Sequence, residues 1–187
     1  MPNWCNNSIE IYHEDPAKIE ALVAAINDGK FCSHVIPTPK ELKETVSGHC
    51  GDGYEQELNQ FKIKLNQKYF GTTDWYSFQT SRWGTKWEVE PFNPVEIDDD
   101  SKSISFGFHS AWNPPTGVYE ALVEQGFAVR AMYHEPGMAF AGIWEDGYDD
   151  FHELGSLSAE GLAKNLPREL DEAFDISKSM ADRDSEL

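Results

Sequence analysis

Three segments of this chain alternate apolar and polar residues, and this alternation constrains the fold more than any other feature. Residues 8–12, 103–108 and 127–133 place apolar side chains at every second position, beginning with Ile9 and Ile11. A period of two is typical of a β-strand that buries one face. The chain is therefore predicted to form a sheet that packs one side against other elements.

Helical periodicity occupies two of the intervals around these strands. Asp15 and Pro16 supply an N-cap and a first-turn proline, and apolar residues then recur at helical spacing as far as Gly29. The run Asn113-Pro114-Pro115 begins a second helix, which Gly126 ends. Each of these helices follows a predicted strand.

The middle of the chain is more heterogeneous. Residues 31–53 contain two prolines and a glycine cluster, which predict an irregular segment. Residues 54–69 are predicted to form a helix because apolar side chains recur there at helical spacing, and residues 74–78 begin another short helix. The apolar positions of the longer helix are Leu58, Phe61, Leu65 and Tyr69.

A hairpin is predicted around an acidic turn. Alternation from Trp87 to Ile97 indicates one strand, Asp98-Asp99-Asp100 ends it, and residues 103–108 return as the antiparallel partner. After the second helix, the strand at 127–133 turns at Glu135-Pro136-Gly137 into a final strand at 138–144. This last pair is predicted to close the sheet.

The resulting order is strand, helix, long insertion, two antiparallel strands, helix and final hairpin. This is a split βαβ pattern with an extra strand, and it predicts an α+β fold with a ferredoxin-like antiparallel sheet. Residues 1–155 are expected to form one domain, with a helical and loop insertion at about 31–86. Residues 156–187 are expected to form an acidic helical extension that ends in a disordered tail.

The charge of the chain narrows the classes of function. A net charge of −18, from 33 acidic and 15 basic residues, repels phosphates and anionic lipids, which argues against direct binding of nucleic acid or membrane. The start of the chain lacks a secretion signal, and no apolar run is long enough to span a membrane. With three cysteines and no disulfide spacing, a cytoplasmic location is predicted.

Four short runs in this chain resemble a known family. The chain is similar in these runs to the YubB ferredoxin-like proteins of phages and conjugative plasmids, and the likeness spans roughly residues 1–145. The resemblance implies a ferredoxin-like fold and an origin in a mobile element, and it brings no catalytic residues. The four runs are Met1-Pro2-Asn3-Trp4-Cys5-Asn6-Asn7, Val35-Ile36-Pro37-Thr38-Pro39, Trp83-Gly84-Thr85-Lys86-Trp87 and Ala111-Trp112-Asn113-Pro114-Pro115.

One group of residues has the chemistry of a metal site. Cys32, His34, His49 and Cys50 are four nitrogen and sulfur donors that would suit tetrahedral zinc. Zinc-binding pairs are usually separated by two to four residues, however, whereas these are one apart or adjacent. No cofactor is therefore predicted, and a small metal-binding protein or enzyme that uses these residues is retained as an alternative.

Two further groups are candidates for binding a partner protein. Trp83 and Trp87 lie four residues apart and either present an aromatic surface or belong to the core. Acidic side chains either keep the protein soluble or imitate the phosphates of a nucleic acid in the basic groove of an enzyme. The acidic candidates are Asp98, Asp99, Asp100, Asp146, Asp149, Asp150 and Glu153.

These observations predict a non-enzymatic accessory protein of a phage or plasmid. Its expected partner is a host protein with a basic surface, such as a nucleic-acid-directed enzyme of a defence system, which it would inhibit as a charge mimic of DNA. A self-associating protein whose exposed sheet edge pairs between subunits is a second alternative, beside the metal-binding one.

Overall fold

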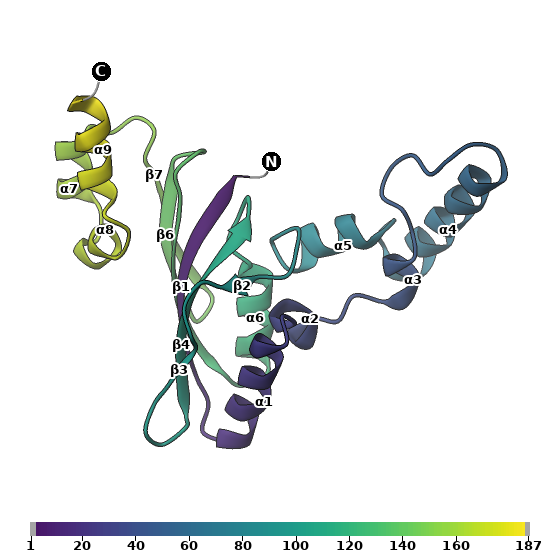
Figure 1. Ribbon diagram of the computed structural model, residues 1–187, viewed down its shortest axis with the longest axis horizontal. Coiled ribbons are helices and arrows are strands. Elements are labelled where there is room, and N and C mark those ends of the chain that lie inside the picture. Colours follow the sequence, from purple (N-terminus) through teal and green to yellow (C-terminus); the bar gives the residue numbers. More distant parts are fainter. Residues whose placement is uncertain (1–2, 186–187) are drawn as a thin grey trace.

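The computed structural model describes the backbone of residues 3–185 and side chains as far as residue 182 (Figure 1). Its centre is an antiparallel sheet in the order β2-β4-β1-β5-β6-β7, with β3 also paired to β4. The α+β class and the antiparallel sheet are thus as expected. The strands are β1 (Trp4–Tyr12), β2 (Glu90–Pro91), β3 (Glu96–Ile97), β4 (Ser103–Ala111), β5 (Ala128–Glu135), β6 (Phe140–Glu145) and β7 (Tyr148–Glu153).

The three strands identified by alternation are the central ones. Ile9 on β1 lies opposite Phe106 on β4 and Ala131 on β5, and all three side chains are almost fully buried. Because side chains alternate across a strand, this register places every apolar position of the three segments on one face. That face forms the main core of the protein.

Helices cover this apolar face (Figure 1). Two of them, α1 (Pro16–Asn27) and α6 (Thr116–Glu124), are the helices expected from periodicity, and Asp15 caps the first by accepting the Ala17 N–H at 3.0 Å. The five-residue helix α2 (Phe31–Val35) lies beside α6 and adds Phe31 to the core, edge-on to Phe106. Their apolar stripes are buried against the sheet.

The predicted strand between Trp87 and Ile97 is interrupted. Within this segment, only β2 and β3, of two residues each, pair with β4. Between them the Asn93 side chain accepts the Gly107 N–H at 2.6 Å, so a side chain takes the place of a backbone partner in the ladder. Pro91 has no N–H to donate, which further shortens this edge strand.

The end of the sheet differs from the predicted hairpin. The strand expected at residues 138–144 is β6, but the chain then turns again and adds β7 at the edge, so the last three strands form a meander. Asp146 and Gly147 make this turn with positive φ values of 45° and 100°. An Asp-Gly pair is a strong hairpin signal, although no strand was predicted after it.

The C-terminal segment packs on the other face of the sheet (Figure 1). It folds into α7 (Ala159–Asn165), α8 (Arg168–Phe174) and α9 (Ile176–Ser185). Leucines from these helices form a second core with Ala141 and Ile143 of β6. The helix α9 continues to Ser185, and residues 186–187, at the end of the tail that the sequence predicts to be disordered, lie outside the described part.

The insertion after α1 forms an arm that projects from the body (Figure 1). It contains α3 (Lys40–Lys43), α4 (Tyr54–Phe70) and α5 (Trp75–Arg82), so the segment expected to be irregular includes the short helices α2 and α3. The helix predicted at 54–69 and the helix start near Asp74 are both present. Within residues 3–185, no helix is long and apolar enough to cross a membrane.

Candidate protein-interaction face

Among residues 3–185, no other element covers part of the sheet face opposite α1 and α6. The C-terminal helices pack over β5 and β6, where α8 makes its sheet contacts. On β1 the side chains that alternate with the buried isoleucines point to this side, and Trp4, Glu10 and Tyr12 are exposed. We call the uncovered part, on β1, β4 and the β2–β3 edge, the open face.

One end of the open face carries an aromatic cluster, which consists of Trp4, Trp87, Phe92 and His109. The Trp4 ring centre lies 6.3 Å from that of Trp87 and 6.4 Å from that of His109, and Phe92 lies 4.9 Å from His109. Three of these rings remain 38–57% exposed. Exposed aromatic side chains gathered at one place are typical of binding surfaces.

Two neighbours hold the cluster in place. Gly107 lies directly beneath the Phe92 ring, and any Cβ at this position would collide with that ring, so glycine is required for Phe92 to lie flat on the sheet. The Lys86 ammonium group stands 4.4 Å from the centre of the Trp87 ring, a cation–π contact. The Trp87 face therefore already accommodates a cation.

The predicted pair of tryptophans is divided between core and surface. Trp83 is 1% exposed and donates its indole N–H to the Ile36 carbonyl at 2.9 Å, so it belongs to the core and is unavailable to a partner. Trp87 is 38% exposed and belongs to the aromatic cluster. The two rings are four residues apart in sequence but point to different environments, because α5 ends at Arg82 and the chain continues from Trp83 without regular helical geometry.

The other end of the open face is an acidic groove of about 420 Å³. The carboxylates of Glu10, Glu96, Asp98, Glu145 and Asp146 line it. One cation, Arg130, also lines the groove, but it is held by Glu145 at 3.7 Å and by Glu169 of α8 at 2.7 Å. The groove is therefore strongly negative, which suits a positively charged ligand.

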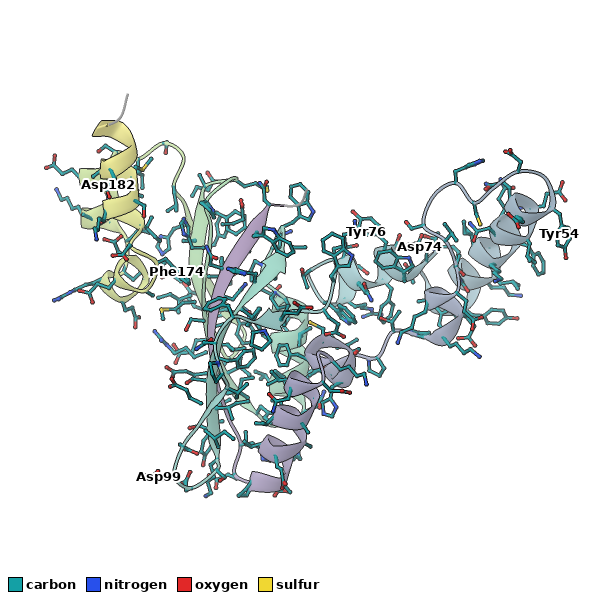
Figure 2. The ribbon with its side chains drawn as sticks, viewed as in Figure 1. Tyr54, Asp74, Tyr76, Asp99, Phe174 and Asp182 are labelled. Carbon is teal, nitrogen blue, oxygen red and sulfur yellow. The ribbon has the colours of Figure 1, made fainter. Side chains whose placement is uncertain are left out.

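Asp98 has a structural role in this groove. Its carboxylate accepts the N–H groups of Lys102 and Ser103 at 2.9 and 3.0 Å and the Ser103 hydroxyl at 2.7 Å. These hydrogen bonds lower the pKa of Asp98 to about 2, and those from Ser103 contribute most. Asp98 thus holds the β3–β4 turn closed, while Asp99 lies at its exposed tip (Figure 2).

The predicted acidic residues at β6 and β7 do not form one surface. Asp149 accepts a 2.6 Å hydrogen bond from the Tyr133 hydroxyl on the side covered by α1 and α6, and burial together with this bond raises the pKa of Tyr133. Asp150 points to the opposite side and lies 3.3 Å from His152. Glu153 is exposed at the end of β7. Of the β6–β7 set, only Asp146 joins Asp98 in the groove.

The proposed metal ligands are separated by the fold. Cys32 is fully buried in α2, where burial raises its pKa, whereas His49 and Cys50 precede α4 in the arm. His34 is exposed. No group of three or more potential metal ligands occurs within the part of the chain that the structure describes.

Burial also raises the pKa of Cys5 to about 12, so this thiol is a poor nucleophile at neutral pH.

Most of the open face was not predicted from the sequence. Trp4 has the same parity as Ser8 and Glu10, which means that a large aromatic residue sits on the polar face of β1. His109 has the corresponding position on β4. This parity can be seen in the sequence, whereas the position of Phe92 over the sheet depends on the interruption between β2 and β3.

Comparison with known proteins adds little. No family model and no curated protein matches the chain. A solved structure of the protein api92 from Yersinia pseudotuberculosis, assigned to the family DUF1281, is 12% identical with a TM-score of 0.39. The match covers 84% of this chain and 99% of that one. A likeness at this level is too weak to support a conclusion about fold or function.

Proposed function

We propose that this protein is a non-enzymatic binding protein whose open face takes a basic segment of a partner protein. The observation that carries the proposal is the placement of the aromatic cluster and the acidic groove on one face, at opposite ends of β1. Arginine suits both ends, because a guanidinium group stacks on indole and also binds carboxylates. The two ends lie roughly 20 Å apart along the nine-residue strand, a length that an extended peptide of about six residues spans.

We further propose that the core is ferredoxin-like. The order β5-β1-β4 followed by the β2–β3 edge, with α1 and α6 on one face, supports this assignment. β6, β7 and the C-terminal helices then extend the core on one side. The mobile-element origin implied by the resemblance favours a nucleic-acid-directed host enzyme as the partner class, since such enzymes have basic grooves.

Binding of an arginine-rich decapeptide, measured by calorimetry and by tryptophan fluorescence, tests the proposal. We expect the affinity to fall steeply with added salt, and to be higher than that of a decapeptide with lysine in place of arginine. Replacing Trp87 by Ala, or reversing Glu10 to Lys, should weaken binding about tenfold, which corresponds to about 1.4 kcal/mol.

The matched control is Glu120→Lys, which makes the same charge change on the exposed side of α6, on the opposite side of the molecule. This variant should bind the peptide almost as tightly as the wild type. Equal weakening by Glu120→Lys and Glu10→Lys would show that only net charge matters. Binding that does not respond to salt would also contradict the proposal.

A further inference from the structure

The long helix of the arm exposes its apolar stripe. Tyr54, Leu58, Phe61, Leu65 and Tyr69 are 77%, 41%, 59%, 38% and 69% exposed. At about 100° per residue, these five side chains fall within an arc of about 80° on one side of α4. The tip of the arm, where Tyr54 lies, is far from the body of the protein (Figure 2). The part of the chain that the structure describes therefore leaves this stripe uncovered.

The buried side of α4 explains this orientation, because the residues buried there, Asn59 and Asn66, are polar. Asn59 donates to the Val46 carbonyl and accepts the Val46 N–H, both at 3.1 Å. Asn66 donates to the Thr45 hydroxyl and to the Thr73 carbonyl, both at 2.9 Å. These bonds fix the asparagine side against the rest of the arm. Rotating the helix to bury its apolar stripe would break all four.

The spacing of the stripe is that of a helix-pairing surface. Tyr54, Leu58, Phe61 and Leu65 are separated by four, three and four residues. This alternation produces the narrow apolar seam through which two helices pack side by side. A helix that merely covers a sheet usually has a broader apolar stripe.

We propose that α4 pairs with α4 of a second copy of this chain in antiparallel orientation. This arrangement matches the stripe with itself. Tyr54 packs against Leu65 of the partner subunit, and Leu58 packs against Phe61 of the partner subunit. The twofold symmetry repeats both contacts, so four apolar layers form without any gap.

Charge supports the same partner and orientation. Glu57 and Lys64 flank one side of the stripe, and antiparallel pairing places Glu57 next to Lys64 of the partner subunit. Glu55 and Lys62 flank the other side and meet in the same way. Within the described residues, neither Glu57 nor Lys64 forms an ion pair in its own chain. Both are therefore available to the second copy.

A parallel pair is less favourable on two counts. It would bring together only one kind of opposite-charge pair, Glu57 with Lys62 of the partner subunit. It would also place both bodies at the same end of the helix pair, although each chain carries a net charge of −18. In the antiparallel pair the bodies lie at opposite ends, where their repulsion is weaker and more fully screened.

The edges of the sheet are poorer sites of self-association. The β7 edge carries Asp149, Asp150 and Glu153, and charged side chains oppose edge pairing. The other edge consists of the two-residue strands β2 and β3. The two α4 stripes together would bury on the order of 1,000 Å², which is at the low end for a specific interface, so we expect a weak, reversible dimer with a Kd in the micromolar range.

Sedimentation velocity over about 1 to 300 μM tests the proposal, because this range brackets a micromolar Kd. The wild-type chain should shift from monomer to dimer. Phe61→Glu places a charge in the centre of the stripe and should remain monomeric throughout. The matched control is Tyr148→Glu, an aromatic residue of similar exposure on β7, which should dimerise like the wild type.

Charge exchange tests the orientation. Glu57→Lys and Lys64→Glu should each weaken the dimer about tenfold, and the double variant should restore it, because the exchanged charges again meet across the pair. No acidic residue lies three or four positions from Lys64, so rescue within one helix is excluded. A wild-type chain that stays monomeric, dimerisation lost in Tyr148→Glu, or a double variant that fails to recover would each overturn the proposal.

Discussion

The helices of the body and the long helix of the arm share the same apolar periodicity, but the apolar side is buried in the body and exposed in the arm. On α1, Ile19, Leu22 and Ile26 recur at helical spacing and are at most 2% exposed. On α4, Leu58 and Leu65 recur in the same manner and are about 40% exposed. Helical spacing thus determines which side chains share a face. What that face meets depends on the surface that the rest of the chain offers.

The largest difference between the two regions should appear when equivalent leucines are shortened. Leu22→Ala leaves a cavity in a closed core and should lower the free energy of unfolding by about 2–5 kcal/mol. Leu65→Ala removes a partly exposed side chain and should lower it by about 1 kcal/mol or less. Urea denaturation at low protein concentration, where α4 does not pair, measures both. Equal losses would mean that α4 is packed as tightly as α1.

A smaller loss of stability is expected when a buried asparagine of the arm is replaced. Asn66→Ala removes two hydrogen bonds and leaves the Thr73 carbonyl without this partner, which should cost about 1–3 kcal/mol. The loss should be confined to the arm and is best measured by hydrogen exchange of the α4 and α5 amides. Gln67→Ala, an exposed neighbour, should change stability by less than about 0.5 kcal/mol. Faster exchange throughout the sheet would contradict a local role.

The smallest effect concerns the β3–β4 turn. Folding lowers the pKa of Asp98 from its ordinary 3.8 to about 2, so its contribution to stability is present above pH 3.8 and is lost as the pH falls towards 2. Asp98→Asn should therefore reduce the pH dependence of thermal unfolding between these values. Asp99→Asn in the same turn is the matched control. An NMR titration of Asp98 that gives an ordinary pKa would disprove the hydrogen-bonded turn.

Much of the fold was predictable because it follows from local chemistry. The alternation around Ile9, Ile104 and Val129 identified the three central strands, and Asp15 and Gly126 marked helix boundaries. The pair Asp146-Gly147 indicates a hairpin, but the strand β7 was not predicted. Its acidic side chains obscure the alternation of apolar and polar residues. The interruption between β2 and β3 depends on a hydrogen bond to residue 107, which local patterns do not contain.

The candidate site was predicted only in part. Trp87, Asp98 and Asp146 lie on the open face or its groove, whereas Trp83 and Asp149 are used internally. A count of acidic residues cannot separate a carboxylate that faces solvent from one that satisfies a buried hydroxyl group. That distinction depends on which strand lies next to which, and hence on long-range pairing.

By itself, the sequence determined the periodic elements, their order and the excess of negative charge, since each of these depends on residues close together in the chain. Only the tertiary structure decided that Trp4, Phe92 and His109 meet on one face, and that α4 turns its asparagines inward and its aromatic rings to solvent. The reason is physical. Burial and proximity depend on contacts between segments about 20 to 100 residues apart, and no local pattern specifies those contacts.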